Sequence, residues 1–243
     1  MKSINKTLLA IALAGLTFSP AGMASDGWQY EITPYIFFSG MKGDIGIGGL
    51  PPVDIDASFG DIADNLEAGF MGMFTARNGP LLFSFDGSYT KLEGNGPLGL
   101  ATLTNKLTIL QGNVGYRVLE DNKVDVDALA GVRYMKLEAD LTISPGSVIP
   151  GGTRSTSDSW ADFVVGGLAT VSVAENVDLI AYVDLGGGSS DFTWQTMLGV
   201  NWQFAERWTA KAGYRYLDVD YEDNGVVFDI ALSGPYLGVG FAF

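Results

Sequence analysis

The sequence predicts an all-β fold, a closed antiparallel up-and-down barrel that crosses a membrane. Apolar residues make up 47% of the 243 residues, and most of the chain alternates apolar and polar residues with the period of two that is typical of strands. After residue 24 the chain has no apolar run of the ~18 residues that a membrane-spanning helix needs. Only helices and closed sheets satisfy every backbone group in lipid, so these observations favour a barrel.

The first 24 residues have the pattern of a secretory signal peptide. Lys2 and Lys6 form a basic start, Leu8 to Leu16 is apolar, and Gly22-Met23-Ala24 supplies small residues for cleavage. We therefore expect a signal peptide over 1–24 and one barrel domain over 25–243, with no linker and no second domain.

Ten segments with strand periodicity follow one another, so ten strands are favoured. They are 27–40, 66–77, 81–93, 104–118, 124–142, 160–173, 178–187, 191–204, 208–218 and 226–243. Short links (78–80, 120–123, 174–176 and 205–207) alternate with longer ones (41–65, 94–103, 143–159, 188–190 and 219–225). Because 188–190 is short for the second group, eight or twelve strands stay possible. The alternation predicts that both termini lie in the periplasm.

The segment Phe192 to Phe204 shows the alternation most clearly, because one face carries Trp194, Leu198 and Trp202 and the other carries Gln195 and polar or small residues. Aromatic residues near both ends of an apolar band are typical of the two interfacial girdles of a membrane protein. The predicted girdle residues are Trp28, Tyr30, Trp194, Trp202, Trp208, Tyr214 and Tyr216.

Two local features interrupt the strand pattern. In the link 41–65, Ser58 and Asp61 are spaced for a capping box, which predicts one helical turn. Pro34 and Pro235 lie in the first and last segments, which are neighbours in a closed barrel, and each removes a ladder donor. We expect this seam to be weakly bonded unless a bulge relieves it.

The carboxyl terminus alternates large apolar residues with small ones and ends on an aromatic residue. Leu237, Val239, Phe241 and Phe243 share one face. This pattern resembles the terminal strand of bacterial outer-membrane β-barrels. The resemblance implies that Phe241 and Phe243 form an assembly signal, and that the barrel assembly machinery is a partner.

A wider resemblance covers essentially the whole mature chain. Its motifs are Trp28-x-Tyr30, Thr33-Pro34-Tyr35, Gly131-x-Arg133-Tyr134, Trp160-x-Asp162, the run from Gly213 to Asp220, and Gly234-Pro235. They resemble small proteobacterial outer-membrane barrels of unassigned function, and the architecture is similar to the transmembrane domain of outer-membrane protein A and to the OmpW group. This implies a fold and a place in the Gram-negative cell envelope, but no ligand.

Charged residues within the strands predict an ion-pair lattice in the lumen. An Arg or Lys on a lipid face costs ~2–4 kcal/mol at the bilayer midplane, so charged residues of the strands should point inward. Acids and bases are nearly balanced in this set, which is Glu31, Asp86, Lys106, Arg117, Arg133, Asp162, Asp184, Lys211 and Arg215.

Composition narrows the possible functions. The chain has no cysteine, so no disulfide holds the fold, and no histidine, which argues against hydrolases or acyltransferases that use a histidine base. The net charge of −14 opposes binding to nucleic acid. Asp218, Asp220 and Glu222 loosely resemble a calcium loop, but Asp223 occupies the position where that loop has glycine, so we expect no metal site. The glycines of 41–65 lack a following Lys and Ser/Thr, and we expect no cofactor.

These features predict an integral outer-membrane barrel that contacts membrane lipid and lipopolysaccharide and is not an enzyme. We expect a structural or envelope-surface role and a lumen largely plugged by ion pairs. The alternative is a narrow porin-like channel for small polar or amphipathic solutes. The sequence leaves the substrate and the oligomeric state open.

Overall fold

A computed structural model describes residues 27–46, 51–95, 101–143, 151–223 and 225–243. The predicted signal peptide, 1–24, lies outside these residues. The described elements are β1 (Gln29–Phe37), β2 (Gly40–Gly46), β3 (Val53–Ala57), α1 (Phe59–Asp64), β4 (Leu66–Asn78), β5 (Leu81–Asn95), β6 (Ala101–Glu120), β7 (Val124–Ile143), β8 (Gly152–Ala174), β9 (Val177–Gly188), β10 (Phe192–Ala205), β11 (Trp208–Asp223) and β12 (Val226–Ala242). No helix in the described ranges is long and apolar enough to cross a membrane.

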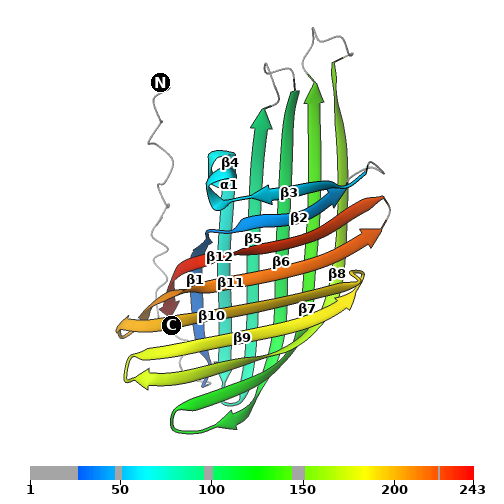
Figure 1. Cartoon of the computed structure of the whole chain (residues 1–243). Helices are drawn as coiled ribbons and strands as arrows, with labels where there is room; N and C mark the ends of the chain where they lie inside the picture. The colour runs from blue at the N-terminus through cyan, green and yellow to red at the C-terminus, as the bar shows by residue number, and fades with distance from the viewer. Residues whose placement is uncertain (1–26, 47–50, 96–100, 144–150, 224) are drawn as a thin grey trace, which may run out of the picture.

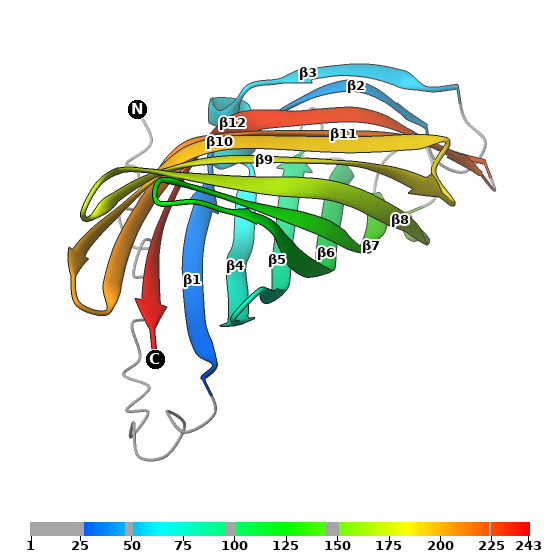
Figure 2. The same cartoon turned by 90° about the horizontal axis from the view of Figure 1, so that it is seen from below.

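The fold is a closed antiparallel barrel of ten strands, β1 and β4 to β12, as the sequence predicts (Figures 1 and 2). Consecutive strands from β4 to β12 pair with one another, β4 pairs with β1, and β1 closes the ring on β12. The start of β1, the carboxyl terminus and the four short turns lie at one end of the barrel, which we call the terminal end. The opposite end, where the longer links lie, is called the loop end.

The two remaining strands form a hairpin outside the ring. β1 and β2 pair with β12 in one continuous register. Phe37 of β1 lies opposite Tyr236, and Gly40 of β2 lies opposite Ser233. Between β1 and β2, the Phe38 N–H donates to the Pro235 carbonyl at 2.9 Å. The β1–β12 ladder contains no bulge. It lacks pairs at Thr33 and Pro34, and proline has no N–H to donate to a ladder.

The prediction that 41–65 is a link is correct only in part, because it contains β2, β3 and α1. The helix begins as predicted: Ser58 Oγ accepts from the Asp61 N–H at 3.3 Å, and Asp61 Oδ2 accepts from the Ser58 N–H at 2.9 Å. The many glycines and prolines of this segment dilute the alternation, which hides the two short strands.

Towards the loop end the barrel flattens into two sheets that cross at a steep angle (Figures 1 and 2). One consists of β9 to β12 with β2 and β3, and the other of β4 to β8. β1 and β4 are paired only as far as Pro34 and Gly72, and beyond this point α1 links β3 to β4. β8 is paired with β9 only up to Asp162, opposite Gly188. Two corners of the wall are therefore left without backbone pairing at the loop end.

Side chains close the corner between β8 and β11. The rings of Trp160 and Tyr221 stack with centroids 4.1 Å apart and planes inclined by 4°. Tyr221 Oη also donates to Asp158 Oδ2 at 2.9 Å. Below them, the Ser190 N–H and Oγ, from the tip of the β9–β10 hairpin, each donate to the Asp162 carboxylate at 2.7 Å.

The outer face of the ring carries a band of exposed apolar side chains. Phe163 is 76% exposed, and Phe85, Leu198 and Leu237 are about half exposed on other strands. A protein in water would bury most of these groups, whereas a lipid-facing barrel wall requires them.

The assignment of faces can be tested on β10 and β11. We expect Leu198→Arg to cost ~2–4 kcal/mol of barrel stability, because it places a charge on the apolar outer face. Thr209→Arg, on the lumen face near the terminal end, should cost much less. Equal losses in urea refolding titrations on lipid vesicles would contradict this assignment.

Candidate functional site

Three layers of side chains lie in the lumen, and together they form the candidate site. Ion pairs lie near the terminal end, two arginine networks lie in the middle, and an apolar cluster fills the loop end. The alternation of each strand positions these groups, because every second residue points inward.

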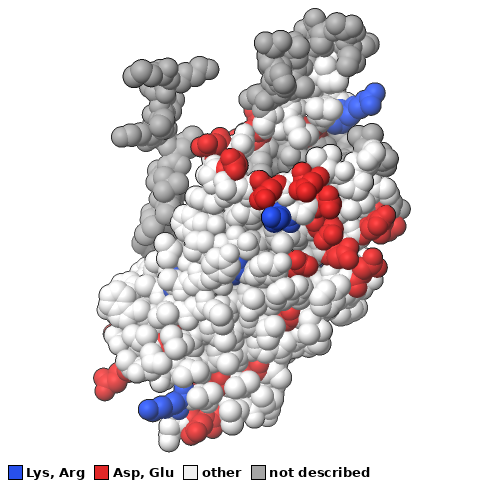
Figure 3. All heavy atoms as spheres, viewed as in Figure 1, with Lys and Arg blue, Asp and Glu red and all other residues white. Residues whose placement is uncertain are grey.

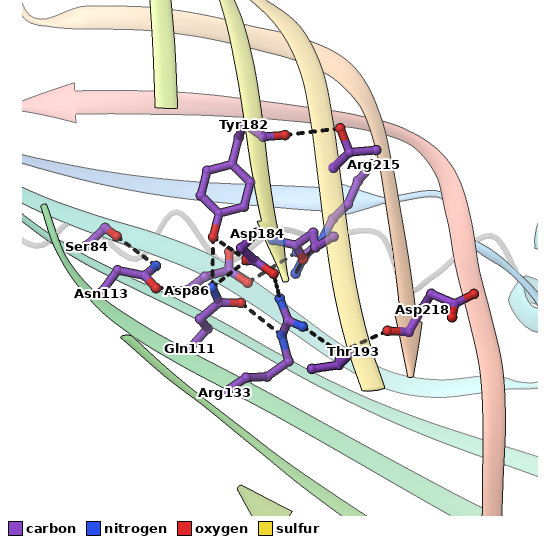
Figure 4. A network of polar contacts seen from close by, with 12 residues as sticks. Ser84, Asp86, Gln111, Asn113, Arg133, Tyr182, Asp184, Thr193, Arg215 and Asp218 are labelled. Carbon is purple, nitrogen blue, oxygen red and sulfur yellow. Dashed lines mark hydrogen bonds and ion pairs between the residues drawn. The ribbon is translucent and has the colours of Figure 1, made fainter. Parts of the chain in front are cut away.

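Arg133, on β7, is the centre of the first network and is completely buried. Its Nη2 donates to Asp184 Oδ1 at 2.6 Å, Nη1 donates to Thr193 Oγ1 at 2.6 Å, and Nε donates to Gln111 Oε1 at 3.1 Å (Figure 4). Gln111 Nε2 and the Tyr182 hydroxyl both donate to Asp184 Oδ2. The network joins four strands, β6, β7, β9 and β10.

Arg215, on β11, is the centre of the second network and is 3% exposed. Its Nε and Nη2 donate to Gln195 Oε1 at 2.9 and 2.6 Å, and Nη1 donates to the Tyr35 hydroxyl at 2.9 Å and to Asp86 Oδ1 at 3.2 Å. Tyr35 in turn donates to Asp86 Oδ2 at 2.8 Å. The guanidinium lies 5.6 Å from the ring centroid of Phe37, within cation–π distance.

Nearer the terminal end, the buried carboxylate of Asp127 accepts from two arginines. Arg77 Nη1 and Nη2 form a bidentate pair with it at 3.0 and 2.7 Å, and Arg117 Nε reaches it at 3.3 Å. Arg117 also pairs with Asp125 at 2.7 Å. On the other side of the lumen, Lys211 pairs with Glu31.

An aromatic ring fills the lumen beside three neighbouring strands. Tyr236 lies over Gly213, its partner in register on β11, and over Gly199, the partner of Gly213 on β10. A Cβ at Gly199 would lie 2.2 Å from the Tyr236 hydroxyl oxygen, and one at Gly213 would lie 2.7 Å from its ring. Only glycine leaves room for this ring.

The loop end of the lumen is apolar, which the sequence reading did not predict. Its buried residues are Ile109, Met135, Leu137, Trp160, Leu217, Val219, Tyr221, Val226, Phe228, Ile230 and Leu232. On the same strands the outward residues become charged, with Lys136 and Glu138 on β7 and Asp218 and Asp220 on β11. The pattern of a lipid-facing barrel therefore inverts here into that of a water-facing sandwich.

The structure brings most of the predicted charged residues together in the lumen. Arg133 pairs with Asp184, Arg215 with Asp86, and Lys211 with Glu31. Arg117 pairs with the acids of β7, and Asp162 binds Ser190, although it lies opposite Arg133 in register. The prediction for Lys106 is wrong. It alternates with the inward residues Ile109 and Gln111, so it lies on the outer face, where it pairs with Asp140 at 3.5 Å.

Several members of these networks were not predicted from the sequence. Asp125 and Asp127 could have been found, because they lie an even number of residues from Arg133 on β7 and so share its inward face. Arg77 could have been found because it lies at the end of a strand that alternates regularly. Gln111, Tyr35 and Tyr182 could not have been found this way. The free-energy cost of an uncharged residue on the lipid face is too small to show that the residue must point inward.

The predicted girdle residues all lie on the outer face of the wall or, for Trp28, just before β1. Trp28 and Tyr30 join Phe74, Phe83 and Phe243 in a stacked cluster at the terminal end. The other predicted residues are Trp202, beside Phe204, Trp208, 4.8 Å from Phe241, Trp194, 4.8 Å from Tyr216, and Tyr214, which is exposed. Phe241 and Phe243 are therefore accessible from outside the barrel wall.

A strongly acidic surface covers the loop end of β11, β12, β2 and β3 (Figure 3). Its exposed residues are Asp44, Asp54, Asp56, Asp220, Glu222 and Asp229, with Lys42 among them. Burial and the charges of Asp229 and Asp191 raise the pKa of Asp220. Asp218, Asp220 and Glu222 lie in a row on a straight strand and do not surround a loop, and the described residues contain no group of three or more ligands that could hold a metal.

Comparison with known proteins identifies the fold. No protein-family model matches the chain, and no curated protein sequence matches it. Among solved structures, the chain is similar to the outer membrane protease OmpT from Escherichia coli, with a TM-score of 0.55, 8% identity, and coverage of 93% of this chain and 100% of that chain.

Two further structures are similar at lower scores. The translocator domain of the autotransporter NalP from Neisseria meningitidis has a TM-score of 0.47, 16% identity, and coverage of 95% of this chain and 91% of that chain. The attachment invasion locus protein Ail of Yersinia pestis has a TM-score of 0.38, 12% identity, and coverage of 90% and 99%. The likeness to OmpT, an outer-membrane β-barrel, confirms the resemblance in fold that the sequence predicts.

The raised pKa of Asp220 gives a prediction on pH. The raised pKa means that the folded chain favours the protonated carboxyl of Asp220. The stabilisation that this gives is complete below the ordinary aspartate pKa of about 3.9 and is lost as the pH rises through the raised pKa. Asp220→Asn should therefore stabilise the fold at pH 7 and change little near pH 3.5. Glu206→Gln, in a terminal-end turn, is the control. A constant difference between Asp220→Asn and wild type across urea titrations at both pH values would refute this.

Proposed function

We propose that this protein is an integral outer-membrane barrel with a closed lumen and a structural or envelope-surface role. The observation that carries the proposal is the burial of paired charged groups and of an apolar cluster inside the barrel. Arg133 and Met135, successive inward residues of β7, are both fully buried, and they lie where the polar and the apolar layers meet. A barrel of this strand number has an interior that side chains can fill.

The energetics of the arginine networks support a closed resting state. Removing one partner of a buried ion pair typically costs about 3–5 kcal/mol, because the other charge is left unpaired. A solute passing the middle of the barrel would have to separate Arg133 from Asp184 or Arg215 from Asp86. It would also have to displace the apolar cluster, in which Trp160 and Tyr221 are the only described residues that carry an N–H or O–H group on the side chain.

The second candidate is a narrow channel for small polar or amphipathic solutes. It is favoured by the charged groups near the terminal end, because the side chains of Arg77 and Lys211 are partly exposed to solvent at 23% and 15%. Water therefore reaches this part of the lumen. The channel reading requires the central networks and the apolar cluster to rearrange during conduction.

The likeness to a protease supports no enzymatic proposal for this chain. It is a likeness of fold at 8% identity, and the chain has no histidine. The partners we propose are lipid on the apolar outer band, lipopolysaccharide near the loop end, and the assembly machinery at Phe241 and Phe243.

The closed lumen can be tested by planar bilayer recording. We expect wild-type protein to show little steady conductance. Arg215→Ala should raise it, because the truncation opens space and leaves Asp86 unpaired and attractive to cations. Arg154→Ala, at the loop end of β8, is the control and should leave conductance low. Stable wild-type openings of a reproducible size would contradict a closed lumen and favour the channel.

The orientation can be tested by cysteine labelling. We propose that the terminal end lies in the periplasm, because four short turns lie there and the longer links lie opposite. A cysteine at Asp54, on β3, should react with an impermeant maleimide on intact cells, whereas one at Asn176, in the β8–β9 turn, should react only after lysis. Labelling of the Asn176 variant on intact cells would reverse the orientation.

A further inference from the structure

An apolar groove lies on the outer wall of the barrel near the terminal end. It has a volume of about 400 Å³, and its lining includes Phe83, Phe85, Gly112, Val114 and Val132. This volume is within the ~300–1,000 Å³ of typical small-molecule sites. The groove crosses β4, β5, β6 and β7, and no other part of the described chain reaches over it.

The side chains facing the groove are all apolar. Phe83, Phe85 and Val114 stand at its sides with 42%, 46% and 50% of their surface exposed. The two polar residues in the lining point away into the lumen, where Asn113 Nδ2 donates to Ser84 Oγ at 3.2 Å. The floor at Gly112 is open, because a Cβ built there would meet no atom within 4 Å.

The depth of the groove restricts what can occupy it. Phe83 lies two residues after β5 begins at Leu81, and its ring is 5.8 Å from Trp28 in the aromatic cluster of the terminal end. The groove therefore begins at the level of an interfacial aromatic belt and extends towards the middle of the apolar band. Only components of the membrane reach this depth.

The width of the groove favours a hydrocarbon chain over a protein segment. Its two sides are formed by side chains of β5 and of β7, which lie two strand spacings, ~9.6 Å, apart on either side of Gly112 on β6. An α-helix with side chains is about 10–12 Å across and cannot enter. With no polar side chain facing it, the groove gives a ligand no directional contact, which suits an acyl chain.

We propose that this groove binds one acyl chain of a phospholipid from the leaflet at the terminal end. Choosing phospholipid over lipopolysaccharide rests on the proposed orientation, because that leaflet is then the periplasmic one. The inference is independent of whether the lumen conducts. The chain would lie between Phe83 and Phe85 on β5 and Val132 on β7, over Gly112 on β6.

The proposal can be tested by native mass spectrometry of the full chain folded in detergent, with phosphatidylethanolamine added at a low molar ratio. We expect wild type to retain one lipid and Gly112→Leu to bind it at least tenfold more weakly. The new side chain occupies the space of several methylene groups, and the loss of about two buried methylenes already accounts for tenfold. Ala212→Leu, which adds the same side chain to the outer face of β11, should behave as wild type.

Val132→Phe fills the groove from another strand and gives a second test if Gly112→Leu does not fold, as judged by heat-modifiable gel mobility. Lipid retention by a folded groove-filling variant equal to that of wild type would overturn the proposal, as would a wild type that retains no lipid. Loss of a dimer without loss of lipid would show that the groove binds a second copy. Stronger retention of lipopolysaccharide than of phosphatidylethanolamine would overturn the choice of phospholipid while leaving the closed lumen unaffected.

Discussion

The guanidinium groups of Arg133 and Arg215 need partners inside a barrel that gives them no bulk water, and much of the lumen follows from this requirement. Each obtains a carboxylate from a strand that is not its neighbour, Asp184 on β9 for Arg133 on β7, and Asp86 on β5 for Arg215 on β11. Glutamine, threonine and tyrosine groups take up the remaining hydrogen bonds. Because the partners come from separate strands, pairing the charges also braces the barrel across its bore.

The same strands serve two environments in succession. On β7, Arg133 points inward while Val132 faces outward, and a few residues later Leu137 points inward while Glu138 faces outward. β11 changes in the same way. The strand register is continuous across this change, so the chain needs no new element to pass from one environment to the other. The loop end can lose backbone pairing at two corners because a buried apolar core holds its sheets together.

Periodicity predicts the ring well and the lumen only in part. The ten strands follow from alternation and turn signals, because lipid on one side and packed side chains on the other impose a strict period of two. Asp86, Asp184 and Arg215 are predictable because their charge forbids the lipid face. Lys106 is charged and yet faces outward, because its strand extends beyond the apolar band. The alternation of residues does not show how far a strand extends beyond the bilayer. The apolar cluster could not be predicted, because the apolar residues of each of its strands have the same pattern as a lipid-facing strand.

The single register that β1 and β2 share on β12 bears on how the chain assembles. Three strands, β11, β1 and β2, pair with β12, so the ring stays open and the hairpin stays undocked until β12 has paired. Until then the amino-terminal strand and the β2–β3 hairpin each present an open edge that could pair with the wrong strand. Closure of the ring and docking of the hairpin therefore both require β12, which is separated from β1 by nearly the whole described chain, and contacts of such long sequence separation are slow to form.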